Sequence, residues 1–347
     1  MERRGPRLSR RALLLTGGSA AVAVGGGLLA GRRLTDHGPA AGGPEPVGSF
    51  DAAATRQVLA PTRLANTTVA QSFDFDPARG DLYAVQIVQG GMRLAGDGRR
   101  ISGDERTLLG DLCVTRLPAR GGPPEYMYLR GFGHGVSMGV QPGPTGVWLW
   151  TESDADPKTG YGRAVTRIPF RPGATLDSDD PSVRHHRPVP GSVANQPVYD
   201  AHGDRLMVAY RTPGEAGRQW YAVYRAADFA AGRYEELYAV RSAGRAGETF
   251  QGCTLYGAHV YQLTGNEYTE DDGDNPPAEG GNAVLSAIDL RSGEVAGRAP
   301  VTAGRDLPYR EPEGLAVRTT DRPRLCAGFA TGPSGDRRLT VHSFEPL

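Results

Sequence analysis

Five positions of the chain combine a hydrogen-bonding or titratable side chain with the start of an apolar pattern. These leading residues are Gln71, His134, Gln196, Gln251 and Glu313. The next residue is serine, glycine or proline each time, and the second is apolar, as on a strand with one buried face. Together such side chains offer the groups that hold a sugar or a sugar phosphate. The alternative is that they only line a narrow, water-filled channel.

Two of the leading residues are suited to proton transfer. His134 titrates near neutral pH and Glu313 is the carboxylate of the set, so both are candidate catalytic residues. Glycoside hydrolysis needs a second carboxylate at a defined separation. Glu152 and Glu267, each just past a predicted strand, are the candidates. A structural, hydrogen-bonded role is the alternative for His134.

A further group suits an anionic ligand. Arg211 follows the second strand of the third segment, and its forked donors match a phosphate or carboxylate. A surface arginine is an equally good interpretation of that position. The candidate ligand-binding residues are therefore Gln71, Gln196, Gln251, Arg211 and Glu152.

The leading residues recur about every 60 residues, which is the signature of a repeat architecture. Each is followed by a turn and a partner strand. The partner strands are expected at 82–86, 147–150, 206–210, 259–263 and 325–329. Further apolar runs bring most repeats to about four strands, which is typical of propeller blades. The sequence thus predicts an all-β, five-bladed β-propeller of four-stranded blades, because a two-sheet sandwich would not show this period.

The last repeat supplies only three strands before the chain ends. Residues 55–60 form an apolar strand pattern that precedes the first repeat and has no blade of its own. We predict that this N-terminal strand completes the last blade, because closure removes exposed sheet edges. Residues 55–347 are then a single propeller domain.

The N-terminus is predicted to be a targeting segment. Several arginines, including Arg10 and Arg11, precede an uncharged run from Ala12 to Ala30, the pattern of a twin-arginine signal. We assign 1–34 as a signal or an uncleaved anchor and 35–54 as a flexible linker. The expected location is secreted or at the cell surface, with membrane contact only through an uncleaved N-terminus.

Composition narrows the class of partner. The 39 basic and 39 acidic residues balance, which argues against bulk attraction to nucleic acid. The three cysteines, Cys113, Cys253 and Cys326, lie in predicted strands without a CxxC motif, so we expect buried free thiols rather than a disulfide framework. We expect a monomer.

Two acidic loops, 154–160 and 270–277, raise the question of calcium. The first opens like a calcium loop, but Lys158 stands at a ligand position and no closing glutamate follows. The second has oxygen-bearing side chains, but their spacing does not match a calcium-binding loop. We therefore expect no cofactor, with a calcium ion unsupported by any full motif.

Several segments together resemble a known family. They are 71–76, 110–117, 126–137 and 148–152, and the Gly-Phe-Gly-His-Gly sequence at 131–135 is the most specific part. They are similar to the β-propeller shared by teichoic acid biosynthesis protein C and phage receptor-binding tail proteins. The resemblance implies a five-bladed propeller associated with cell-wall glycopolymers.

These observations support three hypotheses. The first is an exported propeller that binds, and in one version remodels, a cell-surface glycopolymer such as teichoic acid at its central face. The second is a secreted hydrolase or lyase acting on a polysaccharide or phosphate-containing polymer. The third is a structural module for protein contacts.

Overall fold

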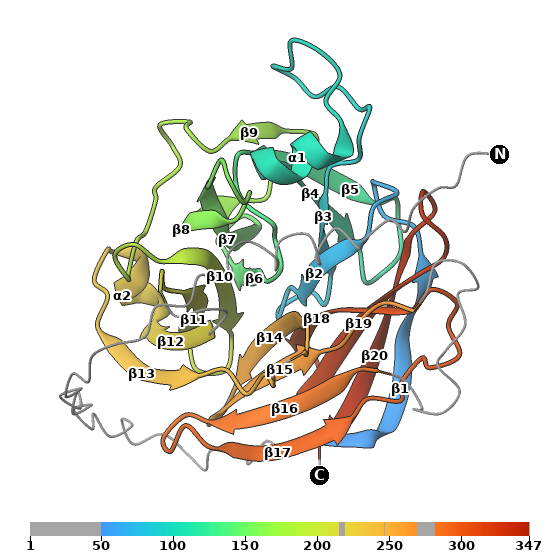
Figure 1. Cartoon of the computed structure of the whole chain (residues 1–347), viewed down its shortest axis with the longest axis vertical. Coiled ribbons are helices and arrows are strands. Elements are labelled where there is room, and N and C mark those ends of the chain that lie inside the picture. Colours follow the sequence, from blue (N-terminus) through green and yellow to red (C-terminus); the bar gives the residue numbers. More distant parts are fainter. Residues whose placement is uncertain (1–49, 215–218, 246, 269–281, 347) are drawn as a thin grey trace. The chain divides into compact units, whose positions relative to one another are not determined.

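The strands of the chain group into five sheets, the blades of a β-propeller (Figure 1). The computed structural model describes residues 50–214, 219–245, 247–268 and 282–346. Blade 1 contains β2 (Ala70–Phe75), β3 (Leu82–Ile87), β4 (Leu112–Leu117) and β5 (Glu125–Arg130). Blade 2 contains β6 (Gly139–Pro142), β7 (Val147–Ala155) and β8 (Gly162–Pro169). Blade 3 contains β10 (Val193–Asp200), β11 (Arg205–Arg211), β12 (Gln219–Arg225) and β13 (Glu236–Arg241).

Blade 4 contains β14 (Phe250–Tyr256), β15 (His259–Thr264), β16 (Val284–Asp289) and β17 (Val295–Pro300). Blade 5 contains β18 (Glu311–Arg318), β19 (Arg324–Thr331), β20 (Arg338–Pro346) and β1 (Phe50–Thr62). We call β2, β6, β10, β14 and β18 the inner strands. Each inner strand contacts the inner strand of the next blade, and the last contacts the first, so the ring is closed. The predicted all-β, five-bladed propeller is confirmed.

The last blade contains the first and the last described strands of the chain. β1 pairs antiparallel with β20, as the blue and red strands of Figure 1 show. The predicted closure is confirmed, but β1 begins at Phe50, so residues 50–54 are strand and not linker. Residues 1–49, with the predicted signal and the rest of the linker, lie outside the described residues. No helix in the described ranges is long and apolar enough to cross a bilayer.

Blades 1 and 2 depart from the four-stranded pattern. A short strand, β9 (Thr175–Asp177), adds in parallel to β5. Blade 2 keeps three strands, and an isolated bridge between Val165 and His186 lies along β8. The predicted strand starting at His134 is wrong, because β6 begins only at Gly139. The preceding residues form a loop, and two short helices, α1 (Gly103–Leu109) and α2 (Ala226–Ala230), complete the described elements.

Buried apolar side chains form one cluster at each junction between neighbouring blades. Trp150 of blade 2, for example, packs in a cluster with Leu206 of blade 3, and corresponding clusters lie at the other four junctions. All three cysteines are buried free thiols, as expected. Each blade buries its apolar faces against the two neighbouring blades, and this burial stabilises the propeller.

Ser72, Gly252 and Gly314, each following a leading residue, lie where neighbouring inner strands meet. Ser72 Oγ donates a hydrogen bond of 2.6 Å to the carbonyl of Gly135. A Cβ on Gly314 would lie 3.1 Å from Ser72 Cα, and one on Gly252 would lie 2.7 Å from Gly314 Cα. Small residues are needed here because backbone approaches backbone, as predicted. The inner strands run from a start face, where they begin, to an end face, where they finish.

Candidate functional site

Four of the five leading residues lie at or beside irregularities of the inner strands. The β2–β3 register shifts between Ala70 and Ser72, so Gln71 is the additional residue of a bulge. The pairing of β14 and of β18 shifts in the same way at Gln251 and Glu313. In β10 the shift ends at Gln196. A bulge turns a side chain away from the regular alternation, so these residues are set apart at the start of each inner strand.

The leading residues are all buried. Gln196 accepts a hydrogen bond of 3.3 Å from the amide of Gln219. Gln251 donates its amide to the carbonyl of Gly265 at 3.0 Å. Glu313 is fully buried in β18. Gln71, Gln196, Gln251 and Glu313 each lie near the beginning of an inner strand, so they belong to the start-face end of the propeller.

His134 forms a stack with residues from two other segments. Its ring lies parallel to that of Tyr161, with ring centroids 4.0 Å apart. Its Nε2 lies 3.0 Å from the carbonyl of Thr159, so Nε2 carries the proton and donates it. The guanidinium of Arg211 lies over the Tyr161 ring at 5.5 Å. The structure thus brings together two predicted residues, His134 and Arg211, through a tyrosine that the sequence analysis did not select.

Glu152 shapes the loop that carries His134. Its carboxylate is buried and accepts hydrogen bonds from the backbone N–H of Gly162 at 2.6 Å and of His134 at 3.4 Å. A Cβ on Gly133 would lie 2.5 Å from Glu152 Oε2, which explains the glycine of the Gly-Phe-Gly-His-Gly motif. Burial raises the pKa of Glu152 to about 7, although the hydrogen bonds from backbone N–H groups lower it. Its carboxylate therefore ties the loop of His134 to the first residue of β8.

Replacing Glu152 by alanine is expected to lower the free energy of unfolding by about 1–3 kcal/mol, because buried N–H groups lose their acceptor. The His134 ring should also lose its fixed stacking on Tyr161, since the loop is no longer held. Urea unfolding and the chemical shift of the His134 Cε1 proton measure the two effects. Glu125→Ala is the control, because Glu125 is only partly buried and pairs with Arg116 away from this loop. Unchanged stability and an unchanged histidine signal in Glu152→Ala would contradict this role.

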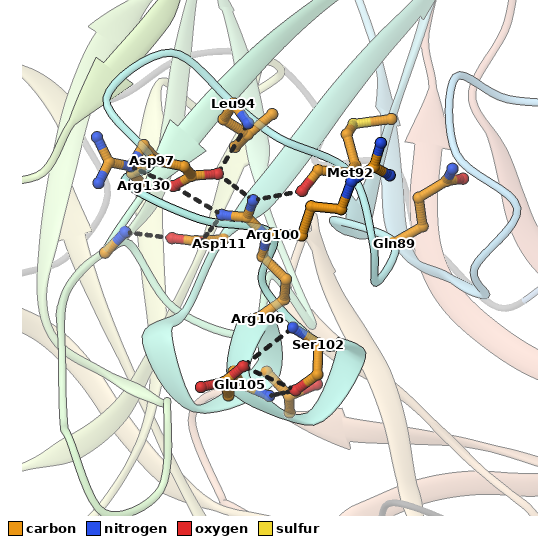
Figure 2. Close-up of polar contacts among 12 residues, drawn as sticks. Gln89, Met92, Leu94, Asp97, Arg100, Ser102, Glu105, Arg106, Asp111 and Arg130 are labelled. Atoms are coloured by element: carbon orange, nitrogen blue, oxygen red, sulfur yellow. Dashed lines mark hydrogen bonds and ion pairs between the residues drawn. The ribbon is translucent and has the colours of Figure 1, made fainter.

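A buried ion-pair network around Arg106 contacts the same loop through Asp111 (Figure 2). The Arg106 guanidinium, on α1, is fully buried and pairs with the carboxylates of Asp97 and Asp111. It also donates to the carbonyl of Met92 at 3.0 Å. The other oxygen of Asp111 accepts the backbone N–H of Gly131 at 3.1 Å. One carboxylate therefore links α1 to the first residue of the Gly-Phe-Gly-His-Gly motif.

The last turn of α1 also lies against the histidine. A Cβ on Gly160 would lie 2.1 Å from the Thr107 carbonyl and 3.0 Å from His134 Nε2. The last turn of the helix and the β7–β8 turn therefore lie next to His134. Sequence analysis missed this helix, although Ser102 and Glu105 form the capping box that signals a helix start.

The two aspartates of the acidic loop 154–160 make ion pairs and hydrogen bonds within the protein. The Asp154 carboxylate pairs with Arg163 and Arg187, each at 2.6 Å. Asp156 accepts the backbone N–H of Lys158 and of Thr159, which closes the turn. The second acidic loop, 270–277, lies outside the described residues. Glu267 lies 3.9 Å from Arg337.

Comparison with known proteins adds the family. The family model of the phage 5-bladed beta propeller receptor binding platform domain matches residues 69–343. The chain belongs to this family. The matched part of this receptor-binding platform propeller starts one residue before β2 and ends within β20. It therefore includes all five inner strands and the loop of His134, whereas β1 precedes it.

Two relatives are informative. A curated protein of Bacillus subtilis (strain 168), "Putative major teichoic acid biosynthesis protein C", is 23% identical over 84% of this chain and 62% of its own length. The tail fiber of Staphylococcus aureus phage P68 aligns over 85% of this chain and 53% of its own, with 17% identity and a TM-score of 0.62. The chain thus spans only part of both relatives. These findings confirm the resemblance drawn from the sequence, and the tail fiber supports the propeller fold of this platform domain.

Proposed function

We propose that this protein is an exported, monomeric propeller that binds a cell-surface glycopolymer, such as teichoic acid, at its start face. Support comes from the receptor-binding description of its family and from the teichoic acid name of its curated relative. The arginine-rich N-terminal sequence supports export. The leading glutamines, Gln71, Gln196 and Gln251, would donate and accept hydrogen bonds with sugar hydroxyls.

The observation that carries the proposal is the stack of His134, Tyr161 and Arg211. Arg211 is partly buried, and its described contact is with the face of Tyr161. No carboxylate among the described residues pairs with it. Its forked N–H donors are thus available for a phosphate or carboxylate of the polymer. The ring of His134 is engaged with Thr159 and Tyr161, which favours binding over remodelling.

Replacing Arg211 by glutamine is expected to weaken binding of purified wall teichoic acid roughly tenfold to hundredfold, because a charge-assisted hydrogen bond is lost. Affinity is measured by calorimetry at fixed salt, with a neutral polysaccharide as a second ligand. Arg291→Gln is the matched control, since Arg291 is an exposed arginine in the turn after β16 at the end face. The proposal fails if the wild-type protein binds neither polymer, or if both variants lose the same affinity.

A further inference from the structure

A second arginine lies on aromatic rings at the opposite end of blade 2. The guanidinium carbon of Arg167, on β8, lies 5.0 Å from the ring centroid of Trp148 and 5.4 Å from that of Trp150. One of its nitrogens is 3.4 Å from Gln141 Oε1, which also accepts the indole N–H of Trp150 at 3.0 Å. The two tryptophans and the glutamine thus fix the orientation of the guanidinium.

This cluster, formed by Gln141, Trp148, Trp150 and Arg167, is separate from the start-face site. β7 runs from Val147 to Ala155, so Trp148 is at its first end and Glu152 is towards its last. Trp150 belongs to the apolar cluster between blades 2 and 3. On the blade 3 side, a Cβ on Gly139 would lie 2.5 Å from Tyr199 N, so β6 and β10 are in close contact beside it. The Arg167 cluster therefore lies between these blades, towards the end face.

No carboxylate among the described residues compensates the charge of Arg167, which is held by the two rings and Gln141 alone. Burial lowers the pKa of the guanidinium, and no carboxylate acts on it. Among neighbouring groups, His186 is neutral because burial lowers its pKa to about 4. Arg184 donates to the carbonyls of Ala230 and Ala231, and Tyr199 donates to Asp204. No carboxylate among the described residues pairs with Arg167.

Several other partly buried arginines in the described part of the chain are paired with carboxylates, although Arg211 is not. Arg205 lies 2.7 Å from Asp200, and Arg116 lies 2.7 Å from Asp81. The fully buried Arg310 donates to the carbonyls of Val301 and Ala303 instead. Taking a cation out of water without a partner is costly. Arg167 bears this cost while its fork is held in place by two rings, which is the arrangement of a preorganised anion receptor.

We propose that the Arg167 cluster binds an oxyanion, the phosphate or carboxylate group of a small ligand, at the end face of blade 2. The anion accepts two parallel N–H bonds from the guanidinium, and the rings of Trp148 and Trp150 hold the fork from behind. The inference does not rest on the proposed start-face function, because it uses none of the same residues.

The test uses the full chain with inorganic phosphate, acetate and neutral glycerol as probes. Indole N–H signals report directly, because the chain has three tryptophans and two of them are in the cluster. Phosphate or acetate should shift the signals of Trp148 and Trp150 saturably, and glycerol should not. Arg167→Gln should lower the affinity roughly tenfold or more, and Arg167→Lys should lose part of it, since the fork is lost but the charge remains. The separate phosphate and acetate titrations identify which oxyanion is preferred.

Arg241→Gln is the matched control, because Arg241 lies over Trp220 at 4.6 Å on an exposed strand end. This variant should bind the anion as the wild type does.

Thermal unfolding separates a binding role from a packing role. Without anion, Arg167→Gln should unfold at the same or a higher temperature than wild type, and only the wild type should gain stability on adding the anion. Absence of saturable shifts with both anions, or equal anion affinity in Arg167→Gln, would overturn the proposal. The proposal would also be overturned if Arg167→Gln unfolded at a lower temperature than wild type and the anion changed the unfolding temperature of neither protein.

Discussion

Replacing Arg106 by glutamine is expected to lower the free energy of unfolding by about 3–5 kcal/mol. The substitution leaves the carboxylates of Asp97 and Asp111 buried without their cation. It also removes the bond to the Met92 carbonyl, which fastens the loop before α1. Denaturant unfolding at pH 7 measures the loss. The start-face loop should loosen as well, since Asp111 also holds Gly131.

The matched control is Arg99→Gln, on the same helix region. Arg99 pairs with Glu105 at 2.6 Å, but its side chain is 65% exposed. Exposed ion pairs contribute about 1 kcal/mol or less, so this variant should unfold close to wild type. Similar losses in the two variants would contradict the view that the Arg106 network holds α1 in place.

The stability of the protein is expected to fall as pH rises from about 4 to about 8, with Asp74 as a main cause. Asp74 is buried in β2 and accepts the backbone N–H of Val140, from β6, at 2.8 Å. Burial raises its pKa to about 8, although hydrogen bonds from Val140 and Phe75 lower it. In this window the folded state keeps the proton while the unfolded state loses it. Each pH unit therefore costs at most about 1.4 kcal/mol.

The measurement is the free energy of unfolding at pH 5 and at pH 8 in wild type and in Asp74→Asn. Glu152 contributes in the same direction between about pH 4.5 and 7, because its pKa is also raised. The difference between wild type and Asp74→Asn isolates Asp74, and its slope should flatten above pH 8. Asp179→Asn, at an exposed position, should follow the wild-type curve. If Asp74→Asn has the same pH dependence as wild type, the carboxyl is ionised in the folded protein throughout.

The five blades could be predicted because four of the five inner strands, β2, β10, β14 and β18, repeat similar requirements. A small residue is needed where backbones meet at Ser72, Gly252 and Gly314, and an apolar residue is needed in each junction cluster. Such requirements recur with the period of the blade and are visible without coordinates. The closing strand was visible for a related reason, since an incomplete last repeat leaves one edge to fill.

The candidate site was less accessible to sequence analysis. The apolar residues Val136 and Met138 alternate as they would on a strand. The segment is nevertheless a loop, because the Glu152 carboxylate accepts hydrogen bonds from its backbone N–H groups. That carboxylate lies on another strand, and no local pattern reports it. Tyr161 and Arg106 were missed for the same reason, because their importance arises from contacts between segments distant in the chain. The bulges at the leading residues likewise depend on pairing register.

The pairing of β1 with β20 has a consequence for how the chain reaches its native state. The hydrogen bond from Ser343 to the carbonyl of Arg56 joins positions 287 apart in the chain. Such pairing carries a high contact order, which slows folding. During synthesis the last blade can close only after β20 has been made, so β1 stays unpaired while the strands between them are synthesised. Loss of β1 or of β20 would leave an open sheet edge able to recruit another chain, which makes deletion of either strand a route to aggregation.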